Sequence, residues 1–156
     1  MVTITTNVTV NDIPRLKQLY KETVLSVNRK DYTAEEVEDW ASCGDSDERW
    51  LELISTLHFF IAENEKGQIA GFASLSDNGL LHSLFVHKDA QRKGVASQLY
   101  RKVEEHAKQQ HIKQVYSEVS KTARPFFEAQ GFTVEEEQQR KANKLYLTNY
   151  KMSKTL

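Results

Sequence analysis

The stretch VHKDAQRKGVASQLYRKVEE changes from an apolar, strand-like run to a helical pattern through a short basic turn. The turn places Gln91, Arg92, Lys93 and Gly94 directly before the helical pattern. The first N–H groups of a helix have no intrahelical partner and lie at the positive end of its dipole, so they bind phosphates where small residues let the ligand approach. Gly94 and Ala96 leave that space. The turn therefore predicts a phosphate site, although an ordinary helix start would carry similar residues.

Two titratable side chains lie where a strand could present them as a general base. His82 lies within the apolar run LLHSLFVH, and an unperturbed histidine has a pKa of about 6.5 that suits proton transfer near neutral pH. Glu63 ends the run FFIAE and is the second candidate. Each also fits a plain surface role, His82 as a strand residue facing solvent and Glu63 as a surface charge.

These residues need a framework, and the periodicity of the chain predicts one. Helical segments are expected at 13–27, 33–40, 47–57, 94–110 and 122–130, and strands at 3–6, 57–64, 68–76, 80–87, 113–120, 132–138 and 144–152. Thr9 with Asp12 and Thr33 with Glu36 form capping boxes, and Asn-Gly in DNG signals a tight turn. The order predicts one α+β domain covering residues 1–156.

Composition limits the function classes. The 156 residues are 39% hydrophobic and 28% charged with a net charge of −1, which indicates a globular chain and argues against a nucleic-acid-coating protein. The single cysteine, Cys43, rules out an internal disulfide framework and suits a reducing compartment. The five histidines show no metal-ligand spacing, so no metal is expected. With no apolar run of about 20 residues and no signal-peptide pattern, we expect a cytoplasmic protein without membrane partners.

Two motifs in order resemble the GNAT superfamily of acyl-CoA-dependent N-acyltransferases. QRKGVA resembles the family's Q/R-x-x-G-x-G/A signature, preceded by the apolar strand HSLFV, and SKTARPFFEAQGF resembles its later segment N/S-x-x-A-x-x-F-Y/F-x-x-x-G-F. IAGFASL and LTNYKM also fit, the latter a bacterial acetyltransferase subgroup of unassigned substrate. The resemblance implies a mixed, mostly antiparallel central sheet of about seven strands, flanked by helices and splayed between the fourth and fifth strands.

The resemblance also implies which residues bind acetyl-CoA, by position in the motifs. The backbone amides of Gln91, Arg92, Lys93, Gly94, Val95 and Ala96 would hold the pyrophosphate, and Leu84, Phe85 and Val86 would pair with the pantetheine arm. Ser120 occupies the position whose side chain contacts the pantetheine, and Arg124 could reach the phosphates or remain a solvated helix residue. Phe127 stands where many members carry the tyrosine that protonates the departing thiolate, so either no acid is used or Tyr146 or Tyr150 replaces it.

The acceptor is expected to be a primary amine of a small molecule or peptide. Tyr32 and Trp40, with His82, are expected to wall its pocket, whereas Trp50 is expected in the core. The predicted activity is acetyl transfer by direct attack in a ternary complex. One alternative is a non-catalytic acyl-CoA-binding regulatory module, which the substitution at Phe127 leaves open. A coenzyme-free nucleic-acid or protein-binding domain is disfavoured. The closing strands could support a homodimer.

Overall fold

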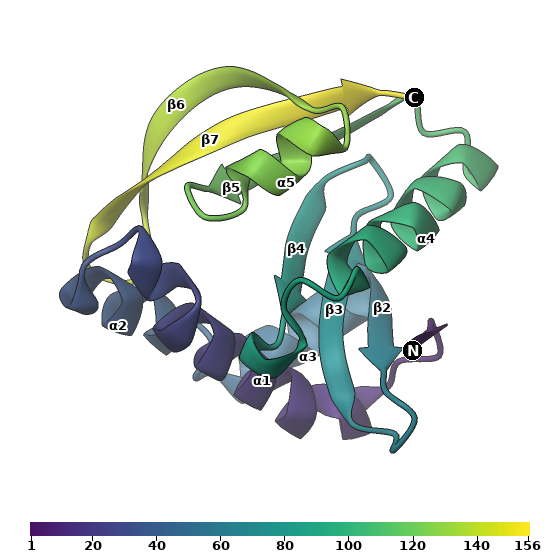
Figure 1. Cartoon of the computed structure of the whole chain (residues 1–156), viewed down its shortest axis with the longest axis horizontal. Helices are drawn as coiled ribbons and strands as arrows, with labels where there is room; N and C mark the ends of the chain where they lie inside the picture. Colours follow the sequence, from purple (N-terminus) through teal and green to yellow (C-terminus); the bar gives the residue numbers. More distant parts are fainter.

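The computed structural model describes all residues, 1–156, as an α+β fold (Figure 1). The helices are α1 (Ile13–Ser26), α2 (Ala34–Ser42), α3 (Asp47–Thr56), α4 (Val95–Gln109) and α5 (Arg124–Ala129), with short 3₁₀ helices η1 (Val10–Asp12), η2 (Asn28–Lys30) and η3 (Lys88–Ala90). The strands are β1 (Thr3–Thr5), β2 (His58–Glu63), β3 (Ile69–Leu75), β4 (Leu81–Val86), β5 (Gln114–Ser120), β6 (Thr133–Lys141) and β7 (Tyr146–Thr155). The expected α+β class and the seven strands are confirmed.

The strands form two antiparallel sheets instead of one continuous sheet. The first has the order β1-β2-β3-β4 and the second β5-β7-β6, so the last strand of the chain lies between β5 and β6. A single parallel bridge from Leu80 to Tyr116 joins β4 to β5. Near it the Ser117 hydroxyl donates to the carbonyl of Leu81 at 2.7 Å. Beyond this junction β4 and β5 separate, which is the splay expected between the fourth and fifth strands.

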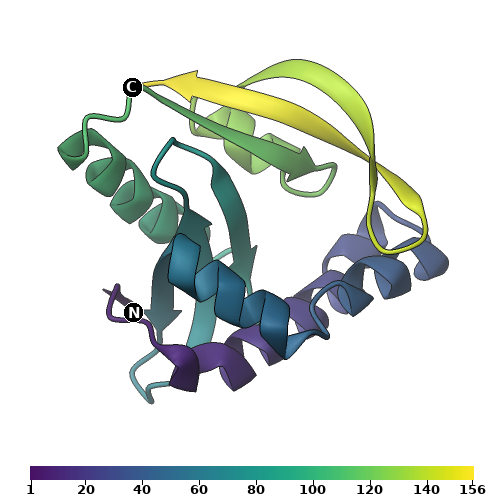
Figure 2. The same cartoon turned by 180° about the vertical axis from the view of Figure 1, so that it is seen from behind.

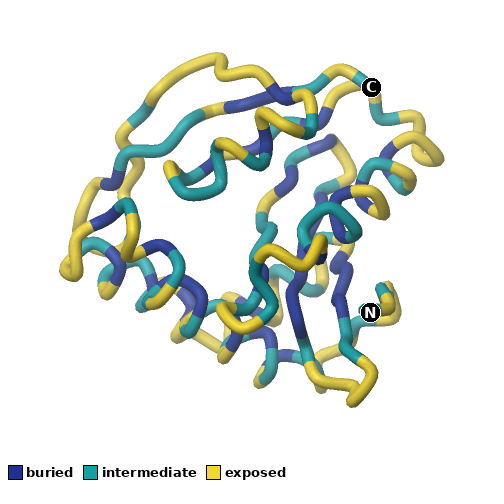
Figure 3. Tube along the Cα trace, viewed as in Figure 1, coloured by how far each residue is buried: buried dark blue, intermediate teal, exposed yellow.

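Helices cover the first sheet on two sides (Figures 1 and 2). The face of α4 that carries Val95, Leu99 and Val103 packs into the main core together with residues of β2, β3, β5 and α5. Leu16 of α1 and Trp50 of α3 pack on Phe72 and Ile61 in a second cluster. The dark-blue stretches in Figure 3 follow these contacts, while β6 is exposed along nearly its whole length.

The helix α2 connects the first half of the chain to the second sheet. The Asp39 carboxylate accepts backbone hydrogen bonds from Asn143, Lys144 and Leu145 at 2.9–3.0 Å, in the turn between β6 and β7. These donors, foremost the N–H of Leu145, hold the pKa of Asp39 below its usual value. Figures 1 and 2 show α2 beside the turn that joins β6 to β7.

Local signals predicted the element boundaries well at the N-terminal side. Both capping boxes, Thr9 with Asp12 and Thr33 with Glu36, are present. The closing strands are longer than expected: β6 runs to Lys141 and β7 to Thr155. The reason is that each strand pairs with its neighbour along almost its entire length. None of the five α-helices combines the length and the apolar character that a membrane span needs.

Candidate functional site: two pockets that meet at the splay

The loop before α4 has the backbone geometry of an anion site. Arg92 and Gly94 both adopt left-handed conformations, with φ of 60° and 79°. None of the N–H groups from Gln91 to Ser97 donates a hydrogen bond within the chain. A side chain at Gly94 would meet no atom within 4 Å, so space lies open over these donors. The loop therefore presents a run of free N–H groups at the positive end of α4.

One cleft of about 320 Å³ opens from this loop along the splay. It is lined by most of the residues predicted for acetyl-CoA: Leu84, Phe85, Val86, Gln91, Arg92, Gly94, Val95, Ala96, Ser120 and Phe127. We call it the donor pocket. Sequence reasoning missed its wall from α1 and η2, where Thr23, Val27 and Asn28 line the same space. No local signal marks them, because they reach the cleft only through tertiary packing.

The free edge of β4 borders the donor pocket. The N–H of His87 donates to the carbonyl of Ala70 at 2.8 Å, and hydrogen-bonded pairs recur at every second residue of an antiparallel ladder. This alternation directs the backbone groups of Phe85 toward β3 and those of Leu84 and Val86 toward the opening. The carbonyl of Val86 accepts the Gln91 side-chain amide at 2.6 Å, so Gln91 braces the loop instead of offering its side chain to a ligand.

Three predicted coenzyme or acid groups lie elsewhere. Lys93 lines a different cavity, between α1 and α4. Arg124 is held over the Tyr150 ring at 4.5 Å and pairs with Glu128 at 3.3 Å, so it lies outside the lining of the donor pocket. Tyr146 is 63% exposed and lines neither pocket at the splay, because it lies at the turn end of β7.

Glu63 is likewise not brought to the splay. Its carboxylate pairs with Arg15 of α1 at 2.7 Å, on a strand that β3 separates from β4, and it lines neither pocket at the splay. Arg15 also binds Asp12 at 2.8 Å. This ion-pair cluster gives Glu63 a structural role.

A second cleft of about 370 Å³ meets the donor pocket at Phe85 and Ser120, the two residues that line both. We call it the acceptor pocket. The residues predicted for the acceptor, Tyr32, Trp40 and His82, all line it. Trp50 lines it too, although it is only 4% exposed and also belongs to the core.

Aromatic rings and charged groups divide the lining of the acceptor pocket. Tyr20 packs edge-on against Trp50 and Phe85, with ring centroids 5.9 and 5.2 Å apart. The charged groups were missed by sequence reasoning and are Arg49, Glu118, Arg140 and Lys141. The one signal for Glu118 was its place two residues before Ser120, which puts both on the same side of β5.

His82 lies among these charges. Although part of its ring reaches solvent, loss of water inside the pocket lowers its pKa, and the nearby charge of Arg49 lowers it further. Glu118 opposes this effect. The ring is therefore neutral near pH 7 and can accept a proton.

The hydroxyl of Tyr32 both donates and accepts a hydrogen bond within the chain. It donates to the carbonyl of Thr148 at 2.6 Å and accepts the N–H of Lys121 at 3.0 Å, so it joins the segment before α2 to β7 and to the end of β5. Burial raises the pKa of Tyr32 to about 12. Tyr32 thus shapes the acceptor pocket and holds its proton.

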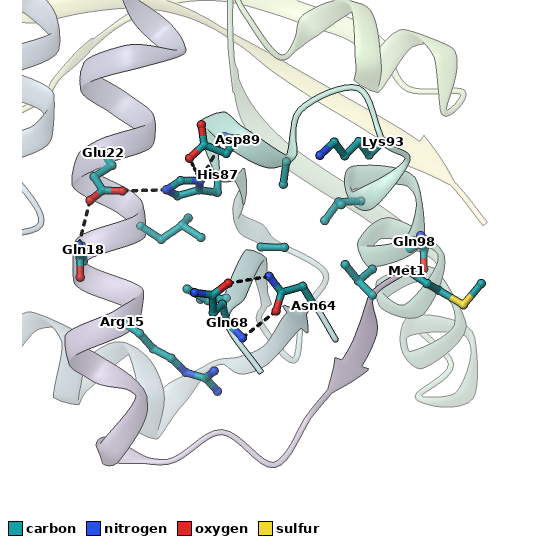
Figure 4. Close-up of a pocket in the computed structure, with 16 residues that line it drawn as sticks. Met1, Arg15, Gln18, Glu22, Asn64, Gln68, His87, Asp89, Lys93 and Gln98 are labelled. Atoms are coloured by element: carbon teal, nitrogen blue, oxygen red, sulfur yellow. Dashed lines mark hydrogen bonds and ion pairs between the residues drawn. The ribbon is translucent and has the colours of Figure 1, made fainter. Parts of the chain in front are cut away.

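A third cavity, of about 530 Å³, lies behind the loop (Figure 4). There the His87 ring bridges α1 and the loop: its Nε2 lies 2.8 Å from Glu22, and its Nδ1 accepts the N–H of Asp89 at 3.1 Å. With Nδ1 as the acceptor from Asp89, Nε2 is the ring nitrogen that donates to Glu22. His87 therefore acts as a strut that fixes the start of the loop from Gln91 to Gly94.

Replacing His87 with alanine is expected to weaken acetyl-CoA binding about tenfold, because the loop loses its support from α1 while its free N–H groups remain. The measurement is the KM for acetyl-CoA at a saturating acceptor concentration. Glu22→Ala is expected to act in the same direction, and the double variant should cost no more than either change alone. Additive effects of the two changes would contradict the strut.

Comparisons with known proteins agree with this geometry. The family model described as Acetyltransferase (GNAT) domain matches residues 28–154. An uncharacterized N-acetyltransferase of Escherichia coli K12, YafP, is 26% identical over 141 residues, which cover 90% of this chain and 88% of that protein.

Solved structures share the whole fold. A GCN5-related N-acetyltransferase from Rhodopseudomonas palustris superposes with a TM-score of 0.94 at 24% identity, covering 100% of this chain and 96% of that one. The PaiA N-acetyltransferase from Thermoplasma acidophilum, solved with coenzyme A, gives 0.82 at 19% identity, covering 100% and 99%. The fold with two sheets that separate beside α4 is thus shared with structures of acetyltransferases. The chain belongs to the GNAT acetyltransferase family.

Proposed function

We propose that the protein transfers the acetyl group of acetyl-CoA directly to the primary amine of a small molecule. The observation that carries the proposal is the meeting of the two pockets at Phe85 and Ser120. The thioester reaches this point from the donor pocket and the amine from the acceptor pocket, so both reactants are held together without a covalent enzyme intermediate. Cys43 lines the acceptor pocket, but burial raises the pKa of its thiol, which disfavours a role as nucleophile.

On the donor side, most of the groups expected to bind acetyl-CoA belong to the backbone. The free N–H groups from Gln91 to Ser97 would bind the pyrophosphate, and the edge of β4 at Leu84 and Val86 would pair with the pantetheine arm. The N–H of Leu84 would then donate to the thioester carbonyl oxygen and stabilise the negative charge that develops on it.

On the acceptor side, the neutral His82 ring takes a proton from the amine. The amine nitrogen forms a bond to the acetyl carbon, the carbon–sulfur bond breaks, and its electron pair leaves with the coenzyme A sulfur. Phe127 offers no hydroxyl and the Tyr32 proton is held by Thr148, so the sulfur departs as a thiolate without a dedicated acid. The amine proton on His82 passes to solvent.

Thermal unfolding and thiol release test the proposal in sequence. Acetyl-CoA at one hundred times its Kd is expected to stabilise the native state by about 2.7 kcal/mol, which corresponds to a Tm increase of roughly 5–11 °C for a chain of this length. Release of free thiol with a panel of amines would follow. A Tm increase without thiol release from any amine would instead support an acyl-CoA-binding module, which the loss of a hydroxyl at Phe127 leaves open. No Tm increase would contradict both functions.

A further inference from the structure

The acceptor pocket combines a wide aromatic wall with an excess of positive charge. Seven aromatic residues line it: Tyr20, Tyr32, Trp40, Trp50, Phe59, Phe72 and Phe85. Trp40 packs against Tyr32 at 5.6 Å between ring centroids and against Phe85 at 6.4 Å, so the wall continues to the point where the pockets meet. A pocket of about 370 Å³ with this lining fits a small ligand that has a large apolar part.

The charges in the lining do not cancel. Glu118 is matched by Arg140, whose Nε and Nη2 lie 3.1 and 3.3 Å from its two carboxylate oxygens. Arg49 and Lys141 remain, and no carboxylate of the lining pairs with either. The one partner of Arg49 is Glu52, 3.2 Å away on the same helix and outside the pocket lining. The pocket therefore offers two positive groups to an anionic ligand.

The third feature is the position of Arg49 relative to the proposed base. Arg49 comes from the first turn of α3 and His82 from β4, and both line the acceptor pocket. The acceptor pocket thus brings a cation of α3 and the proposed base of β4 to one cavity of about 370 Å³. A negative group bound by Arg49 would share this cavity with an amine bound at His82.

We propose that the acceptor is a free amino acid with a large apolar side chain, its carboxylate bound by Arg49 and Lys141 and its side chain packed on the aromatic wall. This inference rests on the proposed function, and it specifies the substrate class. An amino acid carries both an amine and a carboxylate, which matches a pocket lined by both His82 and Arg49. An amine without a carboxylate would leave the two positive groups unpaired.

Tryptophan fluorescence tests the inference without any chemical step. Trp40 and Trp50 are the two tryptophans of the chain and both line the acceptor pocket, so their emission reports its occupancy. The protein saturated with coenzyme A, which has no acetyl group to transfer, would be titrated with L-phenylalanine and with L-phenylalanine amide. We expect the acid to bind at least tenfold more tightly than the amide.

The variant Arg49→Gln identifies the group responsible. It should weaken binding of L-phenylalanine about tenfold and leave binding of the amide unchanged, whereas Arg101→Gln, at an exposed position of α4, should change neither. Equal affinity for acid and amide, or equal loss of both in Arg49→Gln, would overturn the inference. The proposed function is judged separately by thiol release: release with amines that lack a carboxylate would keep acetyl transfer and exclude this substrate class. Acid-selective binding without thiol release from any amine would contradict acetyl transfer and would leave the pocket as a binding site for the amino acid, not as its acceptor site.

Discussion

Gly94→Glu is expected to abolish the stabilisation of the protein by acetyl-CoA. The new side chain would stand in the open space over the free N–H groups of the loop, and its negative charge would repel the coenzyme phosphates. Since ligand stabilisation is RT ln(1 + L/Kd), where L is the ligand concentration, a Kd raised about 100-fold would reduce the shift of about 2.7 kcal/mol expected at one hundred times the original Kd to about 0.4 kcal/mol, and a larger rise would remove the rest. Thermal unfolding with and without acetyl-CoA measures this.

Gly67→Glu is a matched control for that change. Gly67 has nearly the same backbone conformation, with φ of 76° against 79° for Gly94, and a side chain there also meets no atom within 4 Å. Both variants therefore carry the same backbone strain and the same added charge, but Gly67 lies in the turn between β2 and β3. Gly67→Glu should keep the acetyl-CoA shift. If Gly94→Glu kept it as well, the phosphates would have to bind elsewhere.

His82→Ala is expected to lower kcat/KM about 100-fold or more near neutral pH, the usual loss on removing a general base. The pH profile gives a sharper test. His82 acts as a base only when neutral, and its pKa lies below the ordinary value, so wild-type activity should persist at acidic pH values where an unperturbed histidine would already be protonated. In the variant, the acidic fall that reports this group should disappear.

His58→Ala is the control for the loss of a histidine. His58 begins β2 and pairs with Asp77 at 2.8 Å, outside the acceptor pocket. It should leave both the rate and the pH profile unchanged. A His82→Ala profile that matched the wild type would assign the proton to Glu118 or to solvent, because Glu118 is the carboxylate that lines the same pocket.

The sequence was most informative where a function depends on neighbouring residues. The loop from Gln91 to Ala96 could be predicted because its glycine, its small residue and the following helix are contiguous, and a helix N-terminus binds anions by its backbone alone. The strand at 80–87, directly before this loop, could be placed because its apolar residues are also contiguous. Thr33 and Glu36 cap α2 through bonds only three residues apart. Local physics fixes such features, so local patterns predict them.

Contacts between distant segments were beyond this reasoning. Glu118 of β5 and Arg140 of β6 pair across β7, which lies between these two strands. No spacing in the sequence indicates this strand order. Lys93 belongs to the predicted loop, yet it lines the cavity behind it in Figure 4, because two left-handed residues on either side redirect the chain. Glu63 was a candidate base, but in the folded chain its carboxylate pairs with Arg15 of α1.

The two pockets share Phe85 and Ser120 and no other lining residue, which has a consequence for the kinetic order of the reaction. Under the proposed function, neither substrate would have to pass through the space that the other occupies, so we expect that either can bind first and that both orders lead to the same ternary complex. We therefore predict a random sequential scheme, in which neither product must leave before the other.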